Sequence, residues 1–402
     1  MRTMGSRRCP ERLRGGAAKA DLRRAVVRAA LLAWLAAAPA YCAAPYPAGH
    51  RTRLHGHIVM HLAGDGAELG AQHARLAGRL VRRVVKDVIV EGEGAGRYDE
   101  LIRGAMVMER YLPQEYKDEL KALAEGASVP YEQIVALQLF GDVQRGQRCT
   151  SYAVLGPATG NGECIVGRNM DYWDHGVTRY AACLLHYHPR HGIPFMTTSW
   201  TGITNGWTAM NEYGIVCANN SSYGGKDSIE GLSTCFMVRK VVQFARTVEE
   251  GVRIVESTPR ACGTNLIIAG GDPPQAAIVE YDHDRVAVRW AKRGYVAAAN
   301  GFRTLGREGF EEDETEERDT MYSYTMARDD ILRRLIRQNY GRIDETMNFA
   351  AAEGVPIRSM NLHSALIFPQ QRLFRVSMGK CPAADHPYLP YRLTRRGIVA
   401  ER

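Results

Sequence analysis

The spacing of hydrophobic residues changes near residue 149 of the 402-residue chain. Between about residues 57 and 140, apolar positions recur every three or four residues, as in Leu76, Leu80 and Val84. This period predicts helices. Beyond residue 149 the apolar runs are short and rich in β-branched residues, and Gly, Asn or Asp separates them. Such runs predict strands, so the pattern indicates a mostly helical segment followed by a mixed one.

The mixed segment alternates blocks of strand with blocks of helix. Valines at helical spacing predict a helix over residues 235–257, and another helix is expected over about 322–340. Strands are expected over 151–155, 165–167, 181–187, 214–218, 264–269, 276–281, 285–290, 364–368 and 373–377. Blocks of this kind favour sheets covered by helices over a βαβ series, and therefore an α+β fold.

The first 40 residues resemble an export signal. Nine basic and two acidic residues give this leader a charge of +7. The apolar run 29–37 precedes Ala38-Pro39-Ala40, which is typical of a signal cleavage site. The run is shorter than the roughly 20 residues that span a bilayer, and Arg23-Arg24 resembles a twin-arginine signal. We therefore predict export to the periplasm or the extracellular space, with no stable membrane span after signal removal.

The remaining chain is nearly neutral, because the leader carries +7 of the total formal charge of +8. This charge pattern contains no basic stripe for phosphates, so nucleic acid is not expected as a partner. The nine cysteines form no CxxC pair and no Cys/His cluster with zinc spacing, so we predict no metal and no cofactor. The acidic run 308–319 is interpreted as an exposed loop, and the histidine-rich run 186–191 as a surface hairpin.

Candidate chemistry centres on Cys149, which heads a strand-like run. About twenty residues further along, Gly167-Arg168-Asn169-Met170-Asp171 ends a second such run, and a turn over 156–162 links the two. In a hairpin the start of the first strand meets the end of the second. Arg168 and Asp171 are therefore predicted to lie beside Cys149.

This arrangement suits a cysteine nucleophile that needs no histidine. A cysteine attacks as a thiolate, and a base must take up its proton. If the bond between Arg148 and Cys149 is cut, the new α-amine, with an ordinary pKa of about 7.7–8.0, provides that base. Asp171 would orient the amine, and Arg168 would stabilise the thiolate and a bound acyl carbonyl. The plainer interpretations are a buried or disulfide-bonded cysteine and a structural Arg168–Asp171 ion pair.

Cys149-Thr150-Ser151 together with Gly167-Arg168-Asn169-Met170-Asp171-Tyr172 resembles the cysteine N-terminal-nucleophile (Ntn) hydrolases, and most closely the penicillin (isopenicillin N) acyltransferase family. Acid ceramidase and N-acylethanolamine acid amidase are very similar in this segment, and choloylglycine hydrolases less so. The resemblance covers roughly residues 57–380. It implies a four-layer αββα sandwich with an N-terminal helical pro-segment and self-cleavage between Arg148 and Cys149. Residues 1–40 would then be the signal peptide, 41–148 the smaller chain and 149–402 the catalytic chain.

The resemblance also implies further site residues. Asn220, with its neighbour Asn219 as the rival, matches the oxyanion-hole asparagine of the family. Asn300 matches a second asparagine, and Arg318 and Tyr324 are loosely aligned candidates for a later position. As residues that also suit turns, Asn220 and Asn300 have a purely structural alternative.

The sequence thus predicts a self-processing enzyme in which Cys149 attacks a linear amide or thioester of an acylated small molecule. An acyl-enzyme would form and water would resolve it, while the two cleaved chains stay associated. An acyl-CoA-dependent N-acyltransferase and a non-catalytic binding protein on the same fold are the alternatives. Trp200, Trp207 and Tyr223 suit either an acyl pocket or the core.

Overall fold

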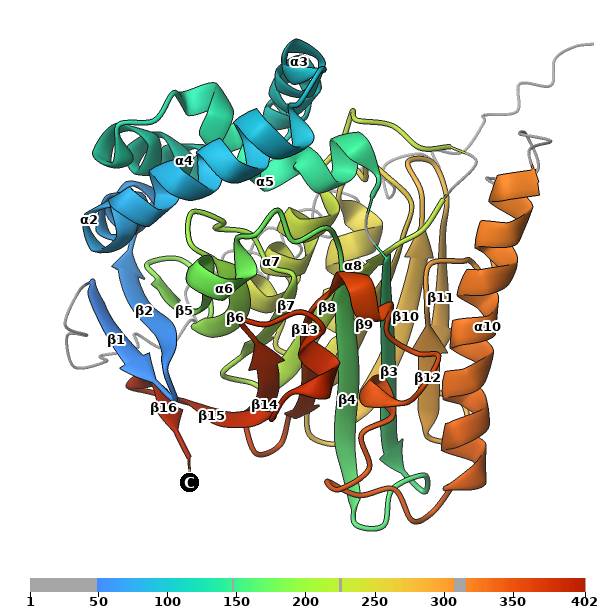
Figure 1. Ribbon diagram of the computed structural model, residues 1–402. Coiled ribbons are helices and arrows are strands. Elements are labelled where there is room, and N and C mark those ends of the chain that lie inside the picture. Colours follow the sequence, from blue (N-terminus) through green and yellow to red (C-terminus); the bar gives the residue numbers. More distant parts are fainter. Residues whose placement is uncertain (1–48, 147, 224–225, 307–315, 402) are drawn as a thin grey trace, which may run out of the picture. The chain divides into compact units, whose positions relative to one another are not determined.

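Two large β-sheets lie face to face at the centre of the unit formed by residues 47–402 (Figure 1). The computed structural model describes residues 49–146, 148–223, 226–306 and 316–401, without the side chains of 316–323. The predicted leader, residues 1–40, therefore lies outside the described residues. Strands β3 and β4 of one sheet contact β8 and β9 of the other, and most of the buried apolar residues lie between these sheets and under the helices that cover them.

The first sheet has nine strands within the described residues. Their order is β1 (His50–Leu54), β2 (His57–Gly64), β5 (Ala182–Pro189), β6 (Phe195–Trp200), β7 (Thr208–Asn211), β8 (Ile215–Ser221), β9 (Thr264–Gly270), β10 (Gln275–Tyr281) and β11 (Val286–Trp290). Strand β2 runs parallel to β5, whereas the other neighbours are antiparallel. The two segments upstream of Cys149, β1 and β2, are thus part of the same sheet as strands downstream of it.

The second sheet has seven strands in the described part of the chain, all paired antiparallel. Their order is β12 (Tyr295–Ala298), β3 (Arg148–Gly156), β4 (Gly162–Asp171), β13 (Asn361–Phe368), β14 (Leu373–Met378), β15 (Leu389–Thr394) and β16 (Gly397–Ala400). The expected hairpin is present as β3 and β4, and its place between β12 and β13 puts Cys149 inside the sheet.

Helices cover the outer face of each sheet. Helices α7 (Thr234–Phe244) and α8 (Val248–Ser257) pack on the nine-stranded sheet, and α10 (Glu316–Gln338) packs on β12 and β3 (Figure 1). The side chains of Ser233 and Thr247 cap α7 and α8, which is why the single helix expected over 235–257 is two helices. The resulting order of layers is α, β, β, α, which confirms the expected α+β sandwich.

The segment before Cys149 is largely helical, as the periodicity predicts. It contains α2 (Gly66–Val84), the π-helix η1 (Val85–Glu93), α3 (Tyr98–Glu109), α4 (Gln114–Ala127) and α5 (Tyr131–Gln144). These helices gather at the top of the view in Figure 1. The prediction of helix from residue 57 is wrong for residues 57–64, which form β2. That run is buried on both faces, so periodicity does not distinguish a strand from a helix there.

Two smaller expectations also differ from the structure. The run 186–191 does lie at a hairpin, between β5 and β6, but His186 is fully buried and only the end of the run reaches the surface. The end of the acidic run, residues 316–319, begins α10, while 307–315 lie outside the described residues.

The other described elements are the short helices α6 (Thr178–Ala181), η2 (Phe349–Ala351), η3 (Arg358–Met360) and η4 (Ala383–Asp385). None of the described helices is long and apolar enough to cross a bilayer.

Candidate active site

The β3–β4 hairpin positions the thiol of Cys149. In its register Arg148 pairs with Asp171, Cys149 with Met170, and Ser151 with Arg168. Since neighbouring residues of a strand point to opposite faces, this register sets which side chains share the face between the sheets. Cys149 and Arg168 lie on the same face as Ser151, whereas Asp171, three residues after Arg168, points to the opposite face; all three side chains are fully buried.

Arg168 contacts the sulfur of Cys149 directly. Its Nη2 donates to Sγ of Cys149 at 3.2 Å, and its Nη1 donates to Oδ1 of Asn220 at 3.0 Å. The backbone carbonyl of Asn169 also accepts from Nη1. These contacts fix the guanidinium plane, so its positive charge is held against the sulfur without rearrangement. A buried cation in this place favours a thiolate and an oxyanion formed beside it.

Asn300 contacts the backbone nitrogen of the same cysteine. The N–H of Cys149 donates to Oδ1 of Asn300 at 2.8 Å. The amide of Asn300 is itself oriented, because its Nδ2 donates to the carbonyl of Ser221 at 2.6 Å, and its own N–H donates to Oγ1 of Thr325 at 2.8 Å. Sulfur and nitrogen of Cys149 therefore each have a side-chain partner from a different strand or loop.

Asp171 pairs with an arginine of α10 and with an asparagine of β13. Its Oδ2 accepts from Nη2 of Arg328 at 2.6 Å, and its Oδ1 accepts from Nδ2 of Asn361 at 2.8 Å. Burial raises the pKa of the Asp171 carboxyl, and the nearby Arg328 opposes that rise. In the intact chain the Cys149 nitrogen donates to Asn300, so a contact between Asp171 and a freed amine stays a prediction.

The two adjacent asparagines of β8 point to different places. Asn220 accepts from Arg168 and donates from Nδ2 to Oγ of Ser151 at 2.6 Å. Asn219 instead donates to Oγ1 of Thr234 in α7, at 3.4 Å. Because only one of two consecutive strand residues faces the second sheet, the structure brings Asn220 and not Asn219 to Cys149.

The structure places a buried arginine, Arg328, near the positions suggested for Arg318 and Tyr324, and the sequence analysis did not select it. The backbone of Arg318 lies in α10, but its side chain lies outside the described residues. Tyr324 is half exposed. One helical turn further along, Arg328 is buried, pairs with Asp171, and donates from Nη1 to Oδ1 of Asn300 at 3.3 Å. The spacing of four residues from Tyr324, about one helical turn, is a signal that could have found it.

A narrow apolar pocket lies next to the nucleophile. Met170, the strand partner of Cys149, lines it together with Trp200, Trp207 and Leu362. Its volume is about 30 Å³, which is about one water molecule's share of the liquid. The segment upstream of Cys149 contributes Val84, Val88 and Phe140 to the wall. Trp200 and Trp207, two of the three aromatic residues that suit an acyl pocket or the core, therefore line this apolar pocket.

Tyr223, the third aromatic candidate, lies instead at the predicted cleavage site. Its hydroxyl accepts from Nη2 of Arg148 at 3.2 Å, and the Arg148 guanidinium lies 5.6 Å from its ring centroid. This contact holds the side chain that precedes Cys149.

Burial disfavours the thiolate form of three other cysteines. All seven cysteines of the described residues are free, and Cys9 and Cys42 lie outside that part of the chain. Burial raises the pKa of Cys164, Cys183 and Cys262 to about 12, because it disfavours the thiolate. Among the described side chains, no group of three or more His, Cys, Asp or Glu is placed to hold a metal ion.

An αββα sandwich whose two sheets enclose a cysteine at a strand start, with an arginine on its sulfur and an asparagine on its nitrogen, defines the class of the N-terminal-nucleophile hydrolases. The chain belongs to the acyl-coenzyme A:6-aminopenicillanic acid acyl-transferase family, which matches residues 158–373. This range includes Arg168, Asp171, Asn220 and Asn300. Enzymes of this family act on amide bonds by hydrolysis or acyl transfer.

Several known proteins are similar to this chain over part of its length. An uncharacterized protein of Archaeoglobus fulgidus is 26% identical over an alignment of 277 residues that covers 60% of this chain and 46% of that protein. Protein dcd1B of Dictyostelium discoideum is 22% identical over an alignment of 258 residues that covers 57% of this chain and 51% of that protein. The chain thus spans about half the length of these curated relatives.

Solved structures with a partial likeness to this chain have low sequence identity to it. The Caenorhabditis elegans ortholog of N-acylethanolamine-hydrolyzing acid amidase has 15% identity and a TM-score of 0.42, over 63% of this chain and 100% of that one. A mutant of the Clostridium perfringens conjugated bile acid hydrolase has 14% identity and a TM-score of 0.40, over 63% and 96%. Penicillin V acylase from Agrobacterium tumefaciens has 15% identity and a TM-score of 0.32, over 57% and 83%.

Proposed function

We propose that the protein is a self-processing cysteine hydrolase that cleaves a linear amide or thioester of an acylated small molecule. One observation supports this most strongly. Arg168 contacts the sulfur of Cys149 while Asn300 contacts its nitrogen, so the two atoms that take part in N-terminal-nucleophile chemistry are both positioned. A structural cysteine needs neither contact.

Self-processing would begin within the chain. The sulfur of Cys149 attacks the carbonyl carbon of Arg148, the C–N bond breaks, and the leaving nitrogen takes up a proton to become the α-amine of Cys149. Water then hydrolyses the thioester, which leaves a carboxylate on Arg148 and restores the thiol. The new amine would remain beside Oδ1 of Asn300, which already accepts from that nitrogen.

The mature site would use the same groups on a substrate. The α-amine takes the thiol proton, and the sulfur attacks the acyl carbonyl to give an oxyanion and then a thioester. Arg168 and the amide of Asn220 would stabilise the developing charge. The leaving amine takes the proton, and water releases the acid. Apart from water and the substrate, each step uses groups of this chain.

The two chains would stay associated after cleavage. Strand β2 forms a parallel ladder with β5, and the buried carboxylate of Glu119 in α4 lies 2.6 Å from the guanidinium of Arg239 in α7. Both contacts join the segment before Arg148 to the segment after Cys149. Release of the smaller chain would expose an edge strand and an unpaired buried charge, which is strongly unfavourable.

The acyl group is expected to be apolar. The pocket beside Cys149 is lined by valines, tryptophans, Phe140 and Leu362, and apolar surface favours an apolar occupant. Its small volume means that a chain of several carbons requires the pocket to widen. The upstream segment supplies part of its wall, so cleavage after Arg148 is the event that would free this wall to move.

We further propose that the protein acts outside the cytoplasm. The basic leader with its apolar run and Ala38-Pro39-Ala40 supports export, and Arg23-Arg24 supports the twin-arginine route. The expected reactants are then small acylated molecules and water.

Acyl transfer is the second candidate, because the matched family is described as an acyl-coenzyme A-dependent transferase. A transferase would pass the acyl group to an amine acceptor faster than to water. Competition between water and a primary amine therefore separates the two activities, and the ratio of amide to acid product is the readout.

The test of the proposed function uses a series of N-acyl amides of increasing chain length. Wild type should release acid and carry an acyl adduct on the chain that starts with Cys149, seen by mass spectrometry after acid quench. Cys149→Ala should do neither, whereas Cys164→Ala, which removes another buried thiol of the same sheet, should keep both. Turnover by Cys149→Ala would overturn the proposal, and it is also the result that a non-catalytic role for this cysteine predicts.

A further inference from the structure

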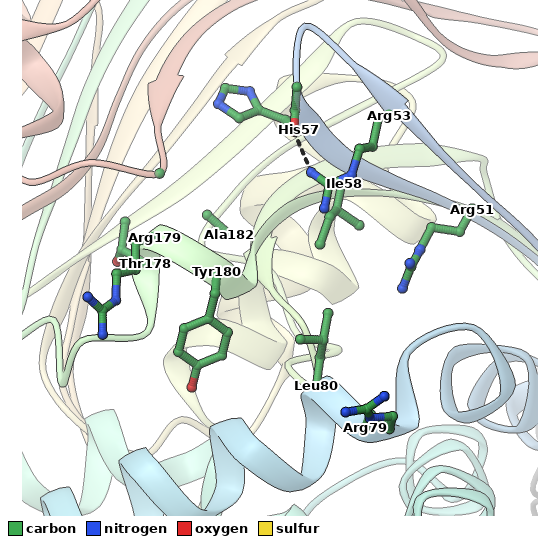
Figure 2. A pocket seen from close by; sticks show the side chains of 12 residues that line it. Arg51, Arg53, His57, Ile58, Arg79, Leu80, Thr178, Arg179, Tyr180 and Ala182 are labelled. Atoms are coloured by element: carbon green, nitrogen blue, oxygen red, sulfur yellow. Dashed lines mark hydrogen bonds between the residues drawn. The ribbon is translucent and has the colours of Figure 1, made fainter.

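A second, larger pocket lies away from Cys149 and has a rim of arginines (Figure 2). Its volume is about 510 Å³, within the range of about 300–1,000 Å³ typical of small-molecule sites. Arg51 and Arg53 come from β1, Arg79 from α2 and Arg179 from α6, and all four are exposed. Segments distant in the sequence thus bring four positive charges to one opening.

The floor of this pocket is apolar. Ile58, Leu80 and Ala182 line it, with the ring of Tyr180 beside them. An apolar floor under a ring of guanidinium groups matches a ligand that has both an apolar part and an anionic group. A flat basic surface has no such floor, so the concave shape favours a single molecule over a bilayer.

The positive charge of the rim is not neutralised by its own lining. None of the described residues that line the pocket is acidic. Arg51 donates from Nη1 to the carbonyl of Leu76 at 2.9 Å, and Arg53 donates to that of Gly56 at 2.7 Å. Each of these hydrogen bonds uses one of the five N–H donors of its guanidinium. The acceptors are uncharged carbonyls, so the positive charge of each arginine is not neutralised.

A carboxylate does lie behind the rim, at Asp87. It accepts from the hydroxyl of Tyr180 at 2.7 Å and pairs with Arg83 at 3.5 Å. Asp87 is therefore engaged with a fifth arginine that does not line the pocket. The four rim arginines repel one another, and an oxyanion among them would relieve that repulsion.

We propose that this arginine-rimmed pocket binds an amphiphilic small molecule with an oxyanion head, such as an alkyl phosphate. Guanidinium groups match the oxygens of phosphate and carboxylate with paired hydrogen bonds, and Ile58, Leu80 and Ala182 receive the apolar tail. The site does not include Cys149, so this binding is independent of the proposed chemistry.

The arginine-rimmed pocket is nevertheless adjacent to the apolar pocket beside Cys149. Val177 lines the apolar pocket and Thr178 lines the arginine-rimmed one. The indole nitrogen of Trp200 donates to Oγ1 of Thr178 at 3.2 Å, and Trp200 is part of the apolar pocket. One thin wall at the start of α6 therefore separates the two.

The test measures binding of n-hexyl phosphate below its micelle concentration by isothermal titration calorimetry on the purified full-length protein. One molecule should bind per chain, at least about tenfold more tightly than inorganic phosphate because of the buried tail. Hexyltrimethylammonium should not bind. Affinity should fall as salt is raised, since exposed charges are screened.

Two double variants with the same charge change assign the site. Arg79→Gln with Arg179→Gln should weaken hexyl phosphate by about tenfold or more. Arg103→Gln with Arg396→Gln, at exposed arginines outside the lining, should bind as wild type does. Equal weakening in both, equal affinity for inorganic phosphate, or binding only to phosphatidylglycerol vesicles and not to the monomer would each overturn the proposal. Cys149→Ala should bind like wild type, so a failed chemistry and a failed site give different results.

Discussion

The Nη2 atom of Arg168 lies 3.2 Å from the Sγ atom of Cys149, and neither side chain is accessible to solvent. The β3–β4 register causes this, since it places Arg168 opposite Ser151 and two residues along from the partner of Cys149. A buried cation at this distance stabilises negative charge on the sulfur and on an oxygen formed next to it.

Arg168→Lys tests how much this geometry contributes. Lysine keeps the charge but is a single point donor, so it cannot contact the sulfur and Asn220 together. We expect the rate of acylation in a single turnover to fall by about 100-fold, with circular dichroism confirming that the variant is folded. A folded Arg168→Lys protein that acylates at the wild-type rate would contradict this role.

The two asparagines of β8 provide a matched pair. Asn220→Ala removes an amide on the Cys149 side of the strand, and we expect kcat to drop by about 100–1,000-fold. Asn219→Ala removes the same group on the α7 side, and kcat should stay within about threefold of wild type. Measured kcat values that fall equally in both variants, or only in Asn219→Ala, would show that Asn220 has no part in the oxyanion site.

The buried pair of Glu119 and Arg239 is expected to hold the two segments together. Burial raises the pKa of Glu119, and Arg239 opposes that rise. Glu119→Gln leaves the Arg239 charge without its partner, so the free energy of unfolding in urea should fall by about 3–5 kcal/mol.

Two variants control for this effect. Glu91→Gln, in the exposed pair with Lys86, should leave urea unfolding nearly unchanged. The double variant Glu119→Leu with Arg239→Met removes both charges and should recover much of the loss. A stable Glu119→Gln protein whose smaller chain remains bound after cleavage would contradict the importance of this pair.

The sequence predicts features that depend on residues close together in the chain. It predicts less well the features that depend on contacts between distant segments. The hairpin of Cys149 and Arg168 follows from two strands and one turn, so its register was predictable. Asn220 and Asn219 stayed undecided because strand parity is not settled by the residues alone. Arg328 was missed because the acidic run before it shows no regular spacing of apolar residues. The family motif therefore could not be aligned reliably across that run. Strand β2 was missed because its pairing partner, β5, lies more than a hundred residues away.

His73 should make the protein sensitive to acid. Its Nε2 accepts from the N–H of Gly202 at 3.1 Å, and burial lowers its pKa to about 4 because the imidazolium loses its hydration. The folded protein keeps His73 neutral, whereas the unfolded chain takes up a proton below pH 6.5. The free energy of unfolding should therefore fall as pH drops from 6.5 toward 4, by about 3 kcal/mol from this residue.

His73→Gln isolates that contribution. Glutamine keeps an acceptor for Gly202 but does not titrate, so its stability should decline less steeply in urea unfolding at pH 6.5, 5.5 and 4.5. The pKa of His61 is also lowered by burial, to about 4, so some acid dependence remains. His191→Gln, at an exposed position, should show the wild-type slope. The same slope in His73→Gln and wild type would contradict the assignment.

Self-cleavage before Cys149 is the central claim, and intact mass spectrometry with N-terminal sequencing tests it most directly. Active wild-type protein should consist of two associated chains, the larger beginning at Cys149. The Cys149→Ala variant should remain uncut at this bond and should not turn over an acyl amide. Active protein without a chain that begins at residue 149, or an alanine variant that is cut there and hydrolyses substrate, would contradict the account.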